Sequence, residues 1–309
     1  MTTIEIAAFY KFARLPHFEA LRRPILDLCA SQGIRGTILL APEGINGTVG
    51  GAQPAMARFM DGLRAVTGLS DLEHKTSHAE AMPFLRMKVR LKDEIVTLGD
   101  ATVDPLETVG TYVEPKDWNA LISDPDVLVV DTRNDFEVRI GSFRGAVDPK
   151  TRSFSDFPAY VRDHLDPARH RKVAMFCTGG IRCEKATSLL KRDGFDEVYH
   201  LRGGILKYLE EIAPDQSLWD GACFVFDERV AVGHGLAVED FALCHGCLTP
   251  LSVRDRAHEA YEEGVACGYC ADNLTPEQKA SNRERHRQVT LARARGESHL
   301  GPKSSGSTG

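Results

Sequence analysis

Hydrophobic residues in the first third of the chain switch between strand and helix spacing. Residues 4–10 carry apolar side chains at every second position, which predicts a strand, and residues 18–32 repeat them at helical intervals. Later patterns predict strands at 36–41 and 48–49, a helix at 54–66, and strands near 72–77 and 87–98. This β-α-β-β-α-β order predicts a ferredoxin-like or acylphosphatase-like α+β domain over residues 1–110.

Three local features of this domain need interpretation. Pro24 falls inside the predicted helix and predicts a kink or a later helix start. Cys29 lies on the apolar face of that helix and is predicted to be a core residue. The glycines from Gly44 to Gly51 resemble a phosphate-binding loop in composition, but no Gly-Lys-Ser/Thr ending follows them. We therefore interpret them as the turn of a β-hairpin.

The middle of the chain alternates short apolar strands with helical segments. Residues 127–130 form a continuous apolar run of the kind found in parallel sheets, and further strands are predicted at 172–176 and 198–201. The pattern predicts an α/β domain over residues 111–215, with a mostly parallel sheet and helices on both faces. Asp131 comes at the end of the first of these strands and is either catalytic or structural. We favour a structural contact with Arg133, Arg144 or a helix N-terminus.

The strand at 172–176 leads into a loop that opens a helix. Its two glycines let the backbone curl and turn its N–H groups inward, and the helix N-terminus and an arginine add positive potential. Such a loop favours an anion at its centre, and the natural anion is the thiolate of Cys177, whose pKa we expect to be depressed. Cys177 is therefore the candidate nucleophile or persulfide carrier, and an inert buried cysteine is the alternative. The candidate anion-binding loop comprises Thr178, Gly179, Gly180, Ile181 and Arg182.

The arginine spacing separates two enzyme classes. Cysteine phosphatases need five residues between cysteine and arginine, whereas Arg182 comes one position early. The loop therefore suits a sulfur-sized group better than a phosphate monoester. Arg182 either holds an anionic intermediate or the substrate backbone, or it pairs with Glu184 or Asp131. Cys183 is either a resolving thiol that forms a disulfide with Cys177 or a packing residue.

The last third of the chain combines a predicted hairpin at 223–232 with two Cys-x2-Cys pairs. A gap of 19 residues separates the pairs, which are Cys244 with Cys247 and Cys267 with Cys270. This spacing is typical of a closed structural zinc site, and two redox pairs are the alternative. A helix predicted from residue 276 carries an excess of Lys and Arg that either contacts nucleic-acid phosphates or forms a solvated face. We assign residues 216–298 to this Cys-x2-Cys domain and residues 299–309 to a disordered tail.

Composition narrows the function classes. The chain has 309 residues, of which 42% are hydrophobic and 27% charged, as expected for a globular protein of two or three domains. A formal net charge of −6 argues against a uniformly basic nucleic-acid binder but allows a local basic surface. The sequence has no apolar run of transmembrane length and no signal-peptide pattern at its start. We therefore expect a cytoplasmic protein with no membrane contact and reduced cysteines.

Several strings of the sequence resemble known families. The chain resembles a rhodanese domain, in order and spacing, at Asp131-Thr132-Arg133, at Gly141-Ser142-Phe143-Arg144-Gly145-Ala146, at the Cys177 loop and at Leu201-Arg202-Gly203-Gly204-Ile205. Two narrower strings resemble the rhodanese-type tRNA uridine hydroxylases. They are Phe176-Cys177-Thr178-Gly179-Gly180-Ile181-Arg182-Cys183-Glu184-Lys185 and Asp148-Pro149-Lys150-Thr151-Arg152-Ser153-Phe154. This resemblance covers nearly the whole chain.

The resemblance implies an activity. It implies oxygen-dependent hydroxylation of the wobble uridine of tRNA, position 34, to 5-hydroxyuridine, with Cys177 essential and the flanking domains holding the anticodon region. Molecular oxygen would be the co-substrate, and the sequence shows no flavin, haem or nucleotide motif. Two alternatives stay open: a sulfurtransferase carrying a Cys177 persulfide to an acceptor, and an RNA-binding or adaptor protein with a vestigial rhodanese domain. No protein partner is deducible.

Overall fold

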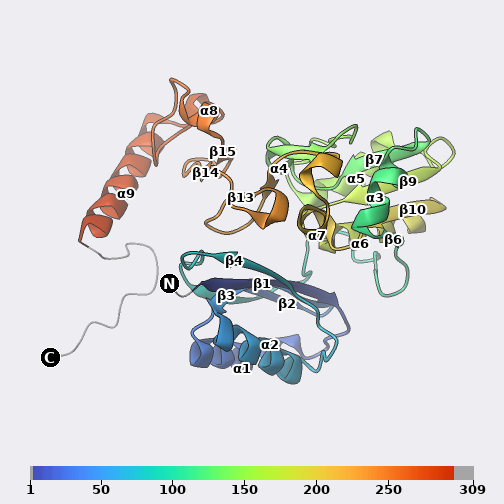
Figure 1. The fold of residues 1–309 in the computed structure, drawn as a ribbon, viewed down its shortest axis with the longest axis horizontal. Coiled ribbons are helices and arrows are strands. Elements are labelled where there is room, and N and C mark those ends of the chain that lie inside the picture. The colour runs from blue at the N-terminus through green and yellow to red at the C-terminus, as the bar shows by residue number, and fades with distance from the viewer. Residues whose placement is uncertain (1–2, 296–309) are drawn as a thin grey trace.

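The computed structural model describes residues 3–295 and arranges them in three parts. In Figure 1 an amino-terminal α+β domain lies below, an α/β domain lies at the upper right, and the carboxyl-terminal region with its long helix lies at the upper left. These architectures confirm the predicted fold classes, while the predicted tail at 299–309 lies outside the described residues. Within residues 3–295, no helix is long and apolar enough to cross a membrane.

The amino-terminal domain is a five-stranded sheet with two helices on one face (Figure 1). The strand order is β4-β1-β3-β2-β5, in which the first four strands give the predicted ferredoxin-like arrangement and β5 adds parallel to β2. The strands are β1 (Ile4–Phe12), β2 (Arg35–Ala41), β3 (Gly44–Ala52), β4 (Lys75–Ala79) and β5 (Met87–Leu91). The helices are α1 (Phe18–Gln32) and α2 (Gln53–Thr67).

Two local expectations for this domain were right only in part. The predicted β-hairpin is present, because β2 and β3 pair antiparallel from Ala41 and Gly44, but the glycines from Gly44 onward lie in strand β3 and not in its turn. They leave room for packing, because a Cβ on Gly47 would lie 2.7 Å from the Phe9 ring and one on Gly51 would lie 2.4 Å from Ile34. Helix α1 also starts well before Pro24 and continues through it, so the proline does not delay the helix.

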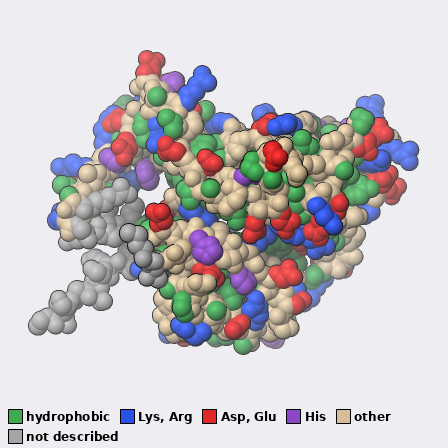
Figure 2. All heavy atoms as spheres, viewed as in Figure 1, with side chains coloured by type: hydrophobic (Ala, Val, Ile, Leu, Met, Phe, Trp, Pro, Cys, Tyr) green, Lys and Arg blue, Asp and Glu red, His purple; other side chains and the backbone are tan. Residues whose placement is uncertain are grey.

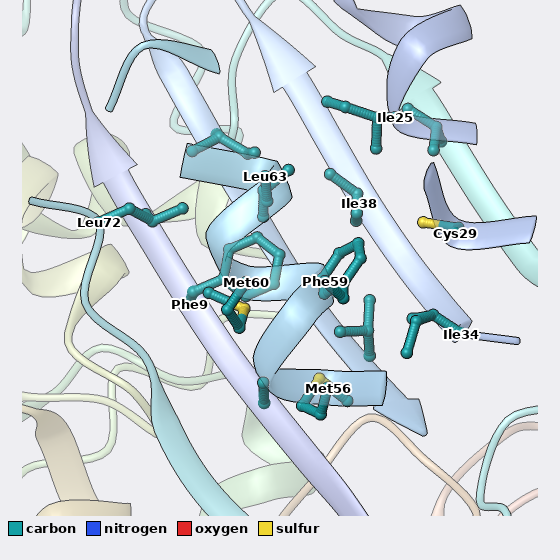
Figure 3. Packing of buried hydrophobic residues seen from close by; sticks show 14 of the residues in the cluster. Phe9, Ile25, Cys29, Ile34, Ile38, Met56, Phe59, Met60, Leu63 and Leu72 are labelled. Carbon is teal, nitrogen blue, oxygen red and sulfur yellow. The ribbon is translucent and has the colours of Figure 1, made fainter. Parts of the chain in front are cut away.

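The two helices and the sheet enclose one apolar core (Figure 3). Met56, Phe59 and Leu63 of α2 pack against Ile38 of β2, and Cys29 of α1 points into the same core as predicted. Alternate residues of a strand face opposite sides of a sheet. The other face of this sheet is therefore free of α1 and α2, and it meets the α/β domain and the carboxyl-terminal region.

The α/β domain is built on a four-stranded parallel sheet of order β6-β10-β9-β7. Its strands are β6 (Thr111–Val113), β7 (Val127–Asp131), β9 (Lys172–Phe176) and β10 (Glu197–Leu201). Helices α5 (Phe157–His164) and α6 (Ile181–Arg192) pack on one face, and α3 (Pro115–Ile122) and α7 (Gly204–Glu211) pack on the other. The parallel sheet with helices on both faces was predicted.

The carboxyl-terminal region begins on the α/β domain. Strand β11 (Trp219–Gly221) pairs with β8 (Gly141–Phe143), and the hairpin of β12 (Cys223–Phe224) and β13 (Ala231–Val232) packs into the same apolar cluster as α3 and α7. Beyond it come β14 (Ala242–Leu243), β15 (Pro250–Leu251), α8 (Val253–Arg256) and α9 (Pro276–Ala294). The domain boundaries at 110 and 215 stay predictions.

A buried cation joins the first two domains. Lys185 of α6 is only 1% exposed, and its Nζ lies 2.8 Å from Glu43 and in contact with Glu94. Both carboxylates belong to the amino-terminal part of the chain. The Lys185 of the narrow sequence string is thus part of the interface that holds the two domains together.

Candidate active site

Cys177 lies where strand β9 meets helix α6 and is 1% exposed. The turn between them requires Gly180, whose φ of 106° is in the region that favours glycine. The Gly180 N–H donates to the Cys177 sulfur at 3.1 Å. The predicted inward-facing backbone N–H is therefore present at this position.

Helix α7 holds the outer side of this loop. The backbone N–H groups of Ile205 and Leu206 donate to the carbonyls of Cys177 and Thr178 at 3.0 and 3.1 Å. A Cβ on Gly204 would lie 2.5 Å from the Cys177 carbonyl oxygen, so only glycine fits there. Gly204 thus closes the loop from the following turn.

The surroundings of Cys177 favour a thiolate. Burial opposes the charged form, but a hydrogen bond from Cys183, the charge of Arg182 and the backbone N–H groups of Cys183 and Gly180 outweigh it and lower the pKa of Cys177 to about 5. A thiol with this pKa is ionised at neutral pH and is a nucleophile. An inert core cysteine, the alternative interpretation, does not have such partners.

Arg182 is engaged by an acid that the sequence did not indicate. Its guanidinium binds the carboxylate of Glu137 in a bidentate pair at 2.6 and 2.8 Å, and both side chains are buried. The alternative pairing with Glu184 or Asp131 is therefore wrong. Asp131 binds Arg133 instead, in a fully buried pair with a contact of 2.6 Å, as its structural interpretation predicted. Glu137 lies in a short helix, Asp135–Val138, whose composition gives no hint of this role.

Cys183 is a packing residue, and its role as a resolving thiol stays a prediction. It is fully buried in the apolar cluster beneath α6, and its sulfur lies 3.6 Å from the Thr132 hydroxyl. Burial and the hydrogen bond to Cys177 raise the pKa of Cys183 well above its ordinary value. Cys183 is thus a neutral thiol beside a thiolate.

The amino-terminal domain reaches the same loop with two side chains that sequence analysis missed. The Tyr10 hydroxyl of β1 donates to Glu184 of α6 at 2.8 Å, and Nζ of Lys75 in β4 donates to the Gly179 carbonyl at 2.8 Å. No local pattern marks either residue. Both residues lie in strands, and only the assembled interface shows that their side chains point toward the α/β domain.

A cavity of about 570 Å³ opens between the two domains, with the Cys177 loop in its wall. This volume is in the range of small-molecule sites. Its lining includes Tyr10, Lys75, Phe84, Phe154, Cys177 and Phe226. Phe226 of the carboxyl-terminal hairpin is 66% exposed, so three parts of the chain contribute to one site. In the view of Figure 2, acidic and basic side chains are interspersed over the surface of the whole molecule.

The four carboxyl-terminal cysteines also come together. Their sulfurs all lie within 4.8 Å of one another, with separations of 3.8 Å for Cys244 to Cys270 and 3.7 Å for Cys247 to Cys267. A zinc ion held at about 2.3 Å by four thiolates has sulfur–sulfur edges of roughly 3.8 Å. The donor set and its spacing therefore fit a closed zinc site.

The basic helix is present as α9, but several of its charges are paired. Thr275 and Gln278 form a capping box at its start, with contacts of 2.8 and 3.2 Å. Arg283 binds Glu262, and Arg287 binds Glu284 at 3.0 Å. The charge excess on this helix is therefore smaller than the count of its arginines suggests. Glu297, an acidic residue that follows these arginines in the sequence, lies outside the described residues.

Comparison with known proteins places the whole chain. The model of the UPF0176 acylphosphatase like domain matches residues 4–95, and that of the rhodanese-like domain matches residues 114–211. A tRNA uridine(34) hydroxylase of Teredinibacter turnerae is 56% identical over 98% of this chain and 94% of its own length. One of Sinorhizobium fredii is 57% identical over 96% and 94%. The solved rhodanese-like domain of an Anabaena sp. protein is 18% identical, with a TM-score of 0.30, over 36% of this chain and 78% of its own.

Proposed function

This chain belongs to the tRNA uridine(34) hydroxylase family, and we propose that it hydroxylates the wobble uridine of tRNA to 5-hydroxyuridine with Cys177 as its nucleophile. The activity itself follows from relatives that match nearly the full length of the chain. The observation that carries the role of Cys177 is its buried, hydrogen-bonded thiolate in the wall of the interdomain cavity.

We propose that the reacting uridine enters this cavity as a single extruded base. A base inside a stacked anticodon is out of reach of a buried sulfur, and enzymes that modify bases take them out of the stack. Phe226, exposed at the cavity, offers an apolar face on which a base can stack. The anticodon region of tRNA is thus the expected partner, and a tRNA substrate supports the predicted cytoplasmic location.

Cys183 is the proposed resolving thiol. A sulfenic acid on Cys177 reacts with the Cys183 thiol to give a disulfide and water, because the S–O bond breaks and the Cys183 proton leaves with the hydroxide. A persulfide on Cys177 gives the same disulfide and hydrogen sulfide. Support comes from the hydrogen bond between the two sulfurs, which places the Cys183 sulfur next to Cys177. Because burial raises the pKa of Cys183 and the thiolate is the attacking form, Cys183 has to lose its proton as it attacks.

The four-cysteine cluster is proposed to bind zinc in a structural role. Four thiolates fill the tetrahedral coordination of the ion and leave no open position for a substrate. Cys244, Cys247, Cys267 and Cys270 would hold the ion and fasten the segment from β14 to α9. Hydroxylation itself uses molecular oxygen, and the residues proposed to act in it all lie around Cys177.

The decisive experiment is nucleoside mass spectrometry of tRNA from cells that lack this protein. We expect 5-hydroxyuridine and its derivatives to disappear and to return with the wild-type gene but not with Cys177→Ser. Loss of a thiolated nucleoside with retention of the hydroxylated ones would instead identify a sulfurtransferase. Full rescue by Cys177→Ser would contradict the nucleophile and favour the vestigial-domain interpretation.

A further inference from the structure

One peptide group links the amino-terminal domain to the reactive sulfur. The Gly179 carbonyl accepts a hydrogen bond from Nζ of Lys75 at 2.8 Å, and the Gly180 N–H of the same peptide group donates to the Cys177 sulfur at 3.1 Å. A peptide group is planar and trans, so its C=O and N–H point in opposite directions. Fixing the carbonyl with Lys75 therefore aims the N–H at the sulfur.

We infer that Lys75 is a positioning residue for the Cys177 thiolate, and that the amino-terminal domain is therefore a working part of the active site. The inference deepens the proposed function, since it rests on Cys177 as the reacting group. Lys75 acts through the Gly179–Gly180 peptide in two ways. It orients the donor, and it polarises the peptide, which strengthens the N–H as a donor.

The charge of Lys75 is available for this purpose. Two buried cations near the loop are neutralised, Arg182 by Glu137 and Lys185 by Glu43 and Glu94. Among residues 3–295, no carboxylate oxygen lies within 4.0 Å of the Lys75 Nζ, which instead lies 5.6 Å from the Tyr10 ring centre. An ammonium group held this way keeps its positive potential for the loop.

Electrostatics agree with the geometry. Burial lowers the pKa of Lys75, while the negative charges of Cys177 and Glu184 raise it. Such an interaction is mutual, so the ammonium favours the thiolate by the same amount. The charged and titratable groups around the thiolate are Lys75 of β4, Tyr10 of β1, and Arg182, Cys183 and Glu184 of α6, with Glu73 and Lys207 further out around Lys75.

The test measures the ionisation of Cys177 in the full-length protein without tRNA. The rate of alkylation by iodoacetamide is followed against pH, and modification of Cys177 is read from its peptide by mass spectrometry. The wild-type midpoint is expected near the Cys177 pKa of about 5. Lys75→Met should raise this midpoint by about 1 pH unit, and Lys75→Arg should keep most of the wild-type value.

Lys88→Met is the matched control. It removes the same charge from the same domain, in strand β5, but Lys88 does not line the cavity, so its midpoint should stay at the wild-type value. Lys75→Gln replaces Lys75→Met if the latter does not fold. An unchanged midpoint in a folded Lys75→Met or Lys75→Gln protein would overturn the inference.

Hydroxylation of tRNA gives the second measurement. Because a raised Cys177 pKa reduces the thiolate fraction at low pH, Lys75→Met should lose more activity at pH 6 than at pH 8 relative to wild type. A purely structural defect would lower activity equally at both. If Cys177→Ser is inactive but Lys75→Met changes neither midpoint nor profile, only this inference fails. If Lys75→Met shifts the midpoint while Cys177→Ser still hydroxylates tRNA, only the nucleophile fails.

Discussion

At the scale of single residues, the buried pair of Glu137 and Arg182 should matter for stability. Glu137→Gln leaves the Arg182 guanidinium buried without its counter-charge. Loss of one partner of a buried ion pair costs about 3–5 kcal/mol, so we expect the free energy of unfolding in urea to fall by that amount. Asp27→Asn is the control, because it breaks the exposed pair with Arg23 at 2.9 Å, and should cost less than about 1 kcal/mol. Equal losses of unfolding free energy in the two variants would contradict a stabilising role for the buried Glu137–Arg182 pair.

The pair of Glu137 and Arg182 should also make the stability of the protein depend on pH. Burial opposes the charged form of Glu137, but Arg182 and further partners outweigh it and lower the pKa of that carboxyl below its ordinary value of 4.5. Its contribution to stability is therefore present above about pH 4.5 and is lost as the pH falls through the folded-state pKa. Urea unfolding between pH 7 and pH 3 should show a steeper loss for wild type than for Glu137→Gln. Parallel curves would contradict this sign.

Residues differ in how far their roles could be predicted from sequence. Cys177 was predictable because a strand, a glycine pair and a helix start surround it within one short string. Glu137, Tyr10 and Lys75 were not, because each reaches the loop from a distant segment and through contacts that only the assembled domains create. The apolar pattern predicts a fold, but it does not say which polar side chain crosses an interface.

At the scale of elements, the start of α7 should be intolerant of any side chain at Gly204. Gly204→Ala puts a Cβ 2.5 Å from the Cys177 carbonyl oxygen in addition to the strain of its φ of 68°. Gly145→Ala has the same kind of strain, with a φ of 77°, but its Cβ meets nothing within 4 Å. Overpacking costs about 1–3 kcal/mol, so Gly204→Ala should lose that much more unfolding free energy than Gly145→Ala. Equal losses would show that the contact relaxes freely.

The cysteine cluster gives a second prediction at this scale. Purified protein should contain about one zinc per chain by plasma mass spectrometry, as four thiolates bind one ion. Cys267→Ser or a strong chelator should remove the metal and increase hydrogen exchange in the segment from β14 to α9, while Cys29→Ala in the amino-terminal core should keep it. Metal-free wild-type protein with unchanged protection in that segment would contradict a structural zinc.

Elements were predicted well where one residue pattern sufficed. The parallel sheet and its helices follow from continuous apolar runs and turns. The glycine-rich strand β3 was mistaken for a turn because its glycines serve the packing of Phe9 and Ile34 from neighbouring elements. Glycines close together in sequence favour a turn, but here pairing within the sheet and packing against its neighbours keep them in a strand.

At the scale of the whole molecule, Lys185 should make the two domains unfold together. Lys185→Met leaves the carboxylates of Glu43 and Glu94 at the interface without their cation. We expect calorimetry to show one cooperative transition for wild type and two separated transitions for Lys185→Met. Lys191→Met, further along α6, removes a lysine whose Nζ donates to the Asp196 carbonyl at 2.7 Å and forms no ion pair within residues 3–295, and it should keep one transition. A single transition in both variants would contradict this role.

The interface also has a consequence for the order in which the two domains fold during synthesis. Residues 4–95 leave the ribosome before the Cys177 loop is made, and domains generally fold as units from the amino terminus. The surface that carries Tyr10 and Lys75 is thus in place when the loop emerges. The cysteine gains Arg182, Cys183 and the Gly180 N–H when its own domain folds, and it gains Lys75 and its cover when that domain docks. A preformed partner surface thus shortens the time during which a reactive thiolate is uncovered.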